Sequence, residues 1–220
     1  SGIPYIIPIE ARVANIINEL NLKTPMYKGL AAYGHLGRED LNISFEQLDK
    51  LEAIKELLID TKIQSYAWNK LFKKELFENL EFPTGKNFED IATTLLLFEK
   101  ANKVTLFEDP KYYYLRRDNS IVGVRNSKTY TDYLEVIYDK YMYLKDKYPE
   151  IEKYNAYNYL INMIWVYSII STFDLDEVFE KFKFNYKLLE EIISIYGEDL
   201  VNELDHYNKA IFYMLILNPD

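Results

Sequence analysis

Two acidic residues at the predicted start of a helix are the side chains best suited to chemistry in this chain. Glu89 and Asp90 follow Asn87, which can cap a helix that we expect over residues 88–101. Backbone amides and the helix dipole hold a carboxylate there ionised and oriented, as a general base requires. Taken alone, the spacing favours a plainer interpretation, because acidic residues commonly occupy the first turn of a helix.

Metal and cysteine chemistry have little support in the sequence. The chain has no cysteine, which excludes disulfides, thiolate metal sites and a cysteine nucleophile. His35 and His206 are its two histidines, and they lie too far apart in the sequence for a recognisable zinc pattern. The segment Asp174–Asp176 carries two aspartates, but it follows an apolar helix and is better explained as a helix cap. We therefore predict that this chain binds no metal.

Charge and composition limit the partners. The formal net charge of −9 argues against nucleic acid, whose binding depends on clustered lysine and arginine. The 21 tyrosines suit half-buried and interface positions, so self-association is an open alternative. The most apolar run, residues 159–173, is shorter than the ~20 residues that cross a bilayer and predicts a core helix. We expect a cytoplasmic protein, with attachment to the inner membrane face through Lys181–Lys187 as the alternative to a solvated helix connection.

The elements that must position these residues are mostly helices. A capping-box pattern of Ser44 and Gln47 predicts the start of the second helix, and Trp165 is expected in the core of a central helix. Strands are expected over residues 103–108 and 111–116. The predicted helices cover residues 9–20, 44–58, 88–101, 128–147, 154–172, 174–182, 186–196 and 199–217.

Three segments after residue 58 resemble the acceptor-side half of a family 2 glycosyltransferase, an inverting sugar-nucleotide enzyme of the GT-A fold. They are Trp68–Lys73 (WNKLFK), Phe88–Asp90 (FED) and Tyr112–Ile121 (YYYLRRDNSI), in the order of that family and roughly at its spacing. The resemblance implies a partial Rossmann-like half. It departs from the family at Leu115, where an arginine is usual, and no donor-binding half with a DxD carboxylate pair precedes Trp68.

This resemblance assigns roles to individual residues. It makes Asp90 the catalytic base with Glu89 beside it, and it places Trp68, Asn69 and Lys70 around the acceptor. It places Arg117 near the diphosphate of the donor. The implied partners are a nucleotide-sugar and a glycan or lipid-linked acceptor, in polysaccharide biosynthesis, with Mn²⁺ or Mg²⁺ in the complete enzyme. Without the donor half, we expect this chain to be inactive alone.

The first quarter of the chain resembles a different family, the methionine adenosyltransferases, also called S-adenosylmethionine synthetases. Residues 10–58 are similar to their carboxy-terminal tail, and Ala31–Arg38 (AAYGHLGR) carries most of the match. The GHPDK segment and the glycine-rich phosphate loop of that family are absent from these 220 residues. His35 lies in the Gly34–Gly37 loop of the synthetase-like segment, where we expect it to pack within a turn.

The fold class that follows is α+β and mostly helical, in three parts. They are a synthetase-like helical segment over residues 1–58, a glycosyltransferase acceptor-half fragment over 59–127, and a tyrosine-rich helical bundle over 128–220. The leading functional prediction is glycosyl transfer. A non-catalytic helical interaction module and a methionine adenosyltransferase fragment are the two alternatives.

Overall fold

The computed structural model describes residues 46–106, 126–170 and 176–217. The chain forms two compact units, one of residues 1–48 with 103–114 and the other of residues 49–102 with 115–220. The boundaries predicted at residues 58 and 127 stay predictions. The expected helix over residues 9–20 and the expected strand over residues 111–116 lie outside the described residues.

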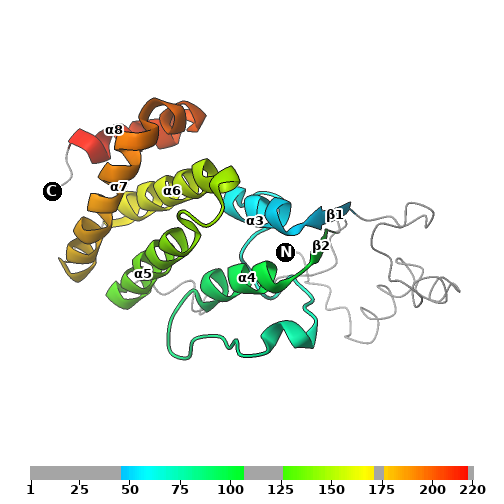
Figure 1. Ribbon diagram of the computed structural model, residues 1–220. Coiled ribbons are helices and arrows are strands. Elements are labelled where there is room, and N and C mark those ends of the chain that lie inside the picture. Colours follow the sequence, from blue (N-terminus) through cyan, green and yellow to red (C-terminus); the bar gives the residue numbers. More distant parts are fainter. Residues whose placement is uncertain (1–45, 107–125, 171–175, 218–220) are drawn as a thin grey trace, which may run out of the picture. The chain divides into compact units, whose positions relative to one another are not determined.

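A two-stranded sheet is the β-structure of the described residues. It pairs β1, Glu46–Asp49, with β2, Lys103–Leu106 (Figure 1). The predicted strand at 103–108 is thus confirmed over its first four residues. The α+β, mostly helical class is correct, whereas a Rossmann-like sheet is not found among the residues that the structure describes.

Helix α3, Lys50–Ile59, starts later than its sequence pattern predicts. Its capping box consists of Asp49 and Glu52: the Glu52 N–H donates to Asp49 Oδ1 at 2.9 Å, and the Asp49 N–H donates to Glu52 Oε2 at 3.1 Å. Gln47 instead lies in β1, so the predicted start at Ser44 is wrong. The helix buries Ala53, Ile54, Leu57 and Leu58 and contacts α4 and α6.

Helix α4, Glu89–Lys100, follows a loop that contains the 3₁₀ helix η1, Lys74–Phe77. Its predicted cap at Asn87 is wrong. Phe88 precedes the helix in a left-handed conformation, with φ of 59°, and makes no side-chain capping bond. The Asn87 backbone N–H and Nδ2 both donate to Asp132 Oδ2, at 2.9 Å each, so this side chain joins the loop to α5 rather than capping α4.

Helices α5, Ser127–Leu144, and α6, Glu152–Ile170, are joined through the 3₁₀ helix η3, Pro149–Ile151. Helix α6 contacts α3, α5, α7 and α8, which confirms its central position (Figure 1). The prediction that Trp165 lies in the core is nevertheless wrong, because 41% of this residue is exposed. The indole lies against the rings of Tyr130 and Tyr133 on α5, and the rest of it stays at the surface.

Helix α7, Asp176–Glu203, is one element where the sequence predicted two helices and the first residues of a third. Its backbone leaves helical geometry at Gly197, which confirms the break expected there. The break expected near residue 184 is absent: Phe182 and Asn185 are fully buried within the helix, so Lys181–Lys187 is not a solvated connection. Ile195, three residues after the buried Ile192, is 67% exposed.

Helix α8, His206–Leu217, is the last element. Its contact with α6 completes the helical unit, whose core runs through α5, α6, α7 and α8. In the residues that the structure describes, every helix is too short or too polar to cross a bilayer.

Candidate functional site

The loop between α3 and α4 holds three of the predicted site residues, and Lys70 fixes its shape. The Lys70 ammonium donates to the carbonyl oxygens of Gln64 and Tyr66, the latter at 2.6 Å, and to Asn69 Oδ1 at 2.7 Å. These three acceptors draw the chain from residue 64 to residue 70 around one cation. Burial lowers the pKa of Lys70 to about 8, against the opposing influence of Asp90 and Asp60.

Asp90 lies in the first turn of α4 and faces the same loop. Its carboxyl is half-buried, and burial raises its pKa, with the neighbouring charge of Glu89 acting in the same direction. Backbone N–H groups of Ile91, Asp90 and Ala67 oppose this shift by favouring the ionised form. The structure therefore brings Asp90 close to the Lys70 loop, as the sequence predicted, while the Glu89 side chain is exposed.

Two aromatic rings lie on the surface of this loop. Tyr66 and Trp68 stack with their ring centroids 5.2 Å apart, and they are 44% and 39% exposed. Asn69 is exposed beside them. Such a pair of rings could contact the apolar face of a ligand. The rings do not line the hollow between α5 and α7.

A pair of charged residues behind the loop was missed by the sequence analysis. Asp60 ends α3 in a left-handed conformation, with φ of 57°, and its carboxyl pKa is raised by desolvation despite nearby Lys140 and Lys70. Lys140 on α5 is only 7% exposed, and burial lowers its pKa to about 8. The missed signal was the position of Lys140 in the apolar stripe of α5, three residues after the buried Ile137.

Buried amides connect this region to the helical core. The Tyr133 hydroxyl on α5 donates to Asn162 Oδ1 on α6, and burial strongly raises the pKa of Tyr133. Asn162 Nδ2 donates to the Asn158 carbonyl at 2.6 Å, and Asn158 Nδ2 donates to the Leu58 carbonyl at 2.7 Å. These bonds satisfy polar groups that would otherwise be costly to bury, and they attach the end of α3 to α6.

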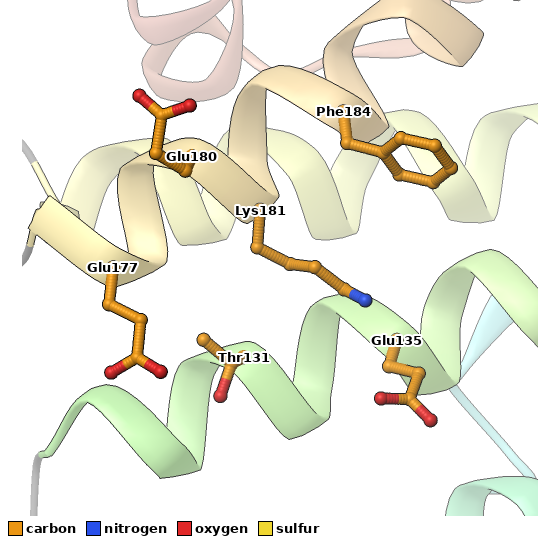
Figure 2. A pocket seen from close by; sticks show the side chains of 6 residues that line it. All are labelled: Thr131, Glu135, Glu177, Glu180, Lys181 and Phe184. Atoms are coloured by element: carbon orange, nitrogen blue, oxygen red, sulfur yellow. The ribbon is translucent and has the colours of Figure 1, made fainter.

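A separate hollow of about 490 Å³ lies between α5 and α7 (Figure 2). Lys181 reaches from α7 toward Glu135 on α5, while Glu180 points away from it. Glu135 forms an ion pair with Lys86, which lowers the pKa of Glu135. The lining side chains are Thr131, Glu135, Glu177, Glu180, Lys181 and Phe184. Across the described ranges, no three acidic or histidine side chains gather in a way that could hold a metal ion.

Some predicted residues cannot be placed. Arg117 and His35 lie outside the described residues, and so do Asp174 and the residue that follows it. Helix α7 begins at Asp176. The roles predicted for Asp90, Glu89, Trp68, Asn69 and Lys70 stay predictions, although the structure shows a positioning role for Lys70 within its own loop.

Comparison with curated proteins finds S-adenosylmethionine synthases that are similar to part of this chain. An S-adenosylmethionine synthase of Streptococcus uberis is 53% identical over 49 residues, which is 22% of this chain and 12% of that protein. Synthases of Clostridium acetobutylicum and Streptococcus suis are 53% and 50% identical over 49 and 50 residues, covering 22% and 23% of this chain and 12% and 13% of those proteins. The chain thus spans about an eighth of the length of these relatives. No family model matches the chain, and no solved structure matches it.

These findings correct the leading functional prediction. The curated matches support the resemblance to the S-adenosylmethionine synthase tail, and nothing supports the glycosyltransferase half. The assignments to glycosyl transfer and polysaccharide biosynthesis are therefore wrong. Short motifs misled here, because an acidic helix start and an aromatic loop also arise from ordinary capping and packing. The donor, the acceptor and the Mn²⁺ or Mg²⁺ implied by that resemblance stay untested predictions.

Proposed function

We propose that this chain contributes the terminal segment of an S-adenosylmethionine synthase and that the helical unit attached to it does no chemistry of its own. The observation that carries this proposal is the identity of about half of 49 residues with synthases from two bacterial genera. The reaction of the complete enzyme, which joins methionine to the adenosyl group of ATP, would then depend on the rest of a synthase.

The use of polar side chains in the helical unit supports a structural role. The Lys70 ammonium has three oxygen acceptors from its own loop, and Asn158 and Asn162 connect helix α6 to its neighbours. Groups that are occupied in this way hold the fold together, and a reaction that used them would first have to break those bonds. We therefore assign no catalytic step to the helical unit.

A chimeric enzyme tests the proposal. Residues 1–58 would replace the matching segment of the Streptococcus uberis synthase, and S-adenosylmethionine formation from ATP and methionine would be followed by chromatography. We expect a rate within about tenfold of the parent synthase, equivalent to ~1.4 kcal/mol. Deletion of the segment and its replacement by an unrelated helical segment of equal length are the controls. A folded chimera that is no more active than the deletion would overturn the proposal.

A second candidate, a non-catalytic helical interaction module, is favoured by the packing of α3. This helix belongs to the synthase-like segment, yet its buried residues Ala53, Ile54, Leu57 and Leu58 contact α4 and α6 of the helical unit. A helix face that is covered in this way cannot at the same time pack on the body of a synthase. Helix α3 would then serve as the first helix of the interaction module.

A longer chimera separates the two candidates. All 220 residues would replace the same segment of the synthase, in parallel with the shorter replacement. If the long chimera is as active as the short one, the helical unit does not prevent the synthase-like segment from packing on the synthase, which supports the first proposal. If only the short chimera is active, the helical unit sequesters α3, and the module is the better description of this chain.

A further inference from the structure

We propose that two copies of this chain associate through the outward face of α8, as an antiparallel pair of helices. This inference does not depend on the proposed function. The outward face carries large apolar side chains whose transfer out of water would be favourable: Tyr207 is 71% exposed, Met214 59% and Leu217 76%. Tyr213, beside them, is 55% exposed.

The opposite face of α8 is already occupied. Phe212 is 5% exposed and Leu215 is fully buried, and the helix contacts α6. The Tyr167 hydroxyl of α6 donates to the Met214 carbonyl at 3.4 Å, a further contact between the two helices. Helix α8 therefore carries apolar side chains on two sides, and only one of these sides is buried within its own unit.

The spacing on the free side is that of a helix-pairing seam. Tyr207, Ala210, Met214 and Leu217 are all exposed, and they follow one another at intervals of three, four and three residues. Side chains at these intervals form one stripe along a helix and insert between the side chains of a partner helix. We call this stripe the α8 seam.

The order of residue sizes favours an antiparallel partner of the same sequence. The intervals read the same in both directions, so an antiparallel copy places Tyr207 opposite Leu217 and the small Ala210 opposite the flexible Met214. A parallel copy would instead place alanine against alanine and leave a gap. A twofold pairing of one patch with itself is the commonest way in which soluble proteins assemble.

The charge of α8 argues against a lipid surface as the partner of this face. Each chain has a net charge of −9, which repels both another copy and an anionic membrane. Helix α8 has no acidic residue, and Lys209 is its one lysine. The seam itself therefore adds no acidic residue to a contact between two copies, and it lacks the cluster of basic residues that binds anionic lipid.

The contact is small, so the dimer should be weak. The exposed parts of Tyr207, Tyr213, Met214 and Leu217 amount to roughly 500 Å² per copy, with about 150–250 Å² for a whole aromatic side chain. A standard interface buries ~800 Å² per partner. We expect a micromolar dissociation constant that falls as added salt screens the repulsion between two acidic chains.

Sedimentation equilibrium of the full chain over a range of concentrations tests this inference. Met214→Glu should weaken association by at least ~10-fold, because it places a charge in the centre of the seam in both copies. Met142→Glu is the matched control, since Met142 is 41% exposed on α5, and it should leave association unchanged. Circular dichroism would establish that both variants stay folded. A monomer at every concentration, or equal weakening by both variants, would overturn the inference.

Cysteine cross-linking tests the antiparallel arrangement. The chain has no cysteine, so introduced thiols report only on their own positions. A mixture of Ala210→Cys and Met214→Cys copies should form the mixed disulfide in preference to either disulfide between identical copies. Preference for identical pairs would overturn the antiparallel arrangement. Binding of the chain to phosphatidylcholine vesicles that Met214→Glu abolishes would show instead that lipid covers this face.

Discussion

Replacing the buried lysine of α5 with methionine should stabilise the protein. Lys140 is only 7% exposed, and burial lowers its pKa from 10.5 to about 8. This shift corresponds to ~3 kcal/mol of unfavourable free energy for the charged form in the folded state. Because Lys140→Met also deprives Asp60 of a favourable neighbour, we expect the free energy of unfolding at pH 7 to rise by ~2 kcal/mol rather than the full amount.

The pH dependence has a definite sign. Below pH 8 Lys140 is protonated in both the folded and the unfolded chain, so folding there carries the full free-energy cost of burying its charge. Between pH 8 and 10.5 the unfolded chain binds more protons than the folded one, and the free energy of unfolding of the parent should rise with pH. Lys140→Met should flatten this rise. It should not abolish the rise, because burial also lowers the pKa of Lys70 to about 8.

Urea unfolding followed by fluorescence of the two tryptophans, at several pH values from 7 to 9.5 and constant ionic strength, measures both effects. The dependence on urea should keep its slope, since the surface exposed on unfolding is unchanged. Lys187→Met on the exposed side of α7 is the matched control and should lie within about 0.5 kcal/mol of the parent. A Lys140→Met variant that is less stable than the parent, with the parent's pH dependence intact, would refute the reasoning.

Three further substitutions test the packing and the helix ends. Trp165→Ala should cost ~1–2 kcal/mol, less than a buried aromatic, because the ring is 41% exposed; a loss above about 3 kcal/mol in urea unfolding would contradict this. Asp49→Ala should remove the capping box with Glu52 and cost ~1 kcal/mol in thermal unfolding, and an unchanged melting temperature would show that the cap is dispensable. Glu99 pairs with Lys147 at 2.5 Å, and its carboxyl pKa is lowered by this and neighbouring hydrogen bonds despite burial. The stability that ionised Glu99 contributes is present above the carboxyl pKa of the unfolded chain and is lost as pH falls through the folded pKa. Glu99→Gln should therefore be less stable than the parent at pH 7 and approach it in acid. An equal loss of unfolding free energy at all pH values would contradict a stabilising role for the ionised carboxylate.

Periodic apolar residues allowed the helices of the second unit to be predicted with useful accuracy. The helix predicted over residues 128–147 is present as α5, where Leu134, Ile137 and Tyr141 are buried at helical spacing, and the break at Gly197 is present. Helix ends were harder, because several residues in one stretch can cap. At α3 the competition between Ser44 and Asp49 is decided by the pairing of the preceding residues into β1, which no local pattern reveals.

Side chains whose burial depends on neighbouring helices could not be predicted from the sequence. Trp165 is apolar and lies on a central helix, yet α5 covers it only in part and 41% of the residue stays exposed. Lys140 is charged, yet it lies among the buried residues of α5, a helix that contacts α4, α6 and α7. For the candidate site, the proximity of Asp90 to the Lys70 loop was predictable as a pair of motifs, whereas Asp60 and Lys140 behind them carried no motif at all.

The rate of S-adenosylmethionine formation by the short chimera tests the central proposal most directly. With residues 1–58 in place of the matching segment of the Streptococcus uberis synthase, we expect a rate within about tenfold of the parent and far above the enzyme that lacks the segment. A folded chimera with the rate of the deletion would contradict the account, because half-identity over 49 residues would then not reflect a shared role.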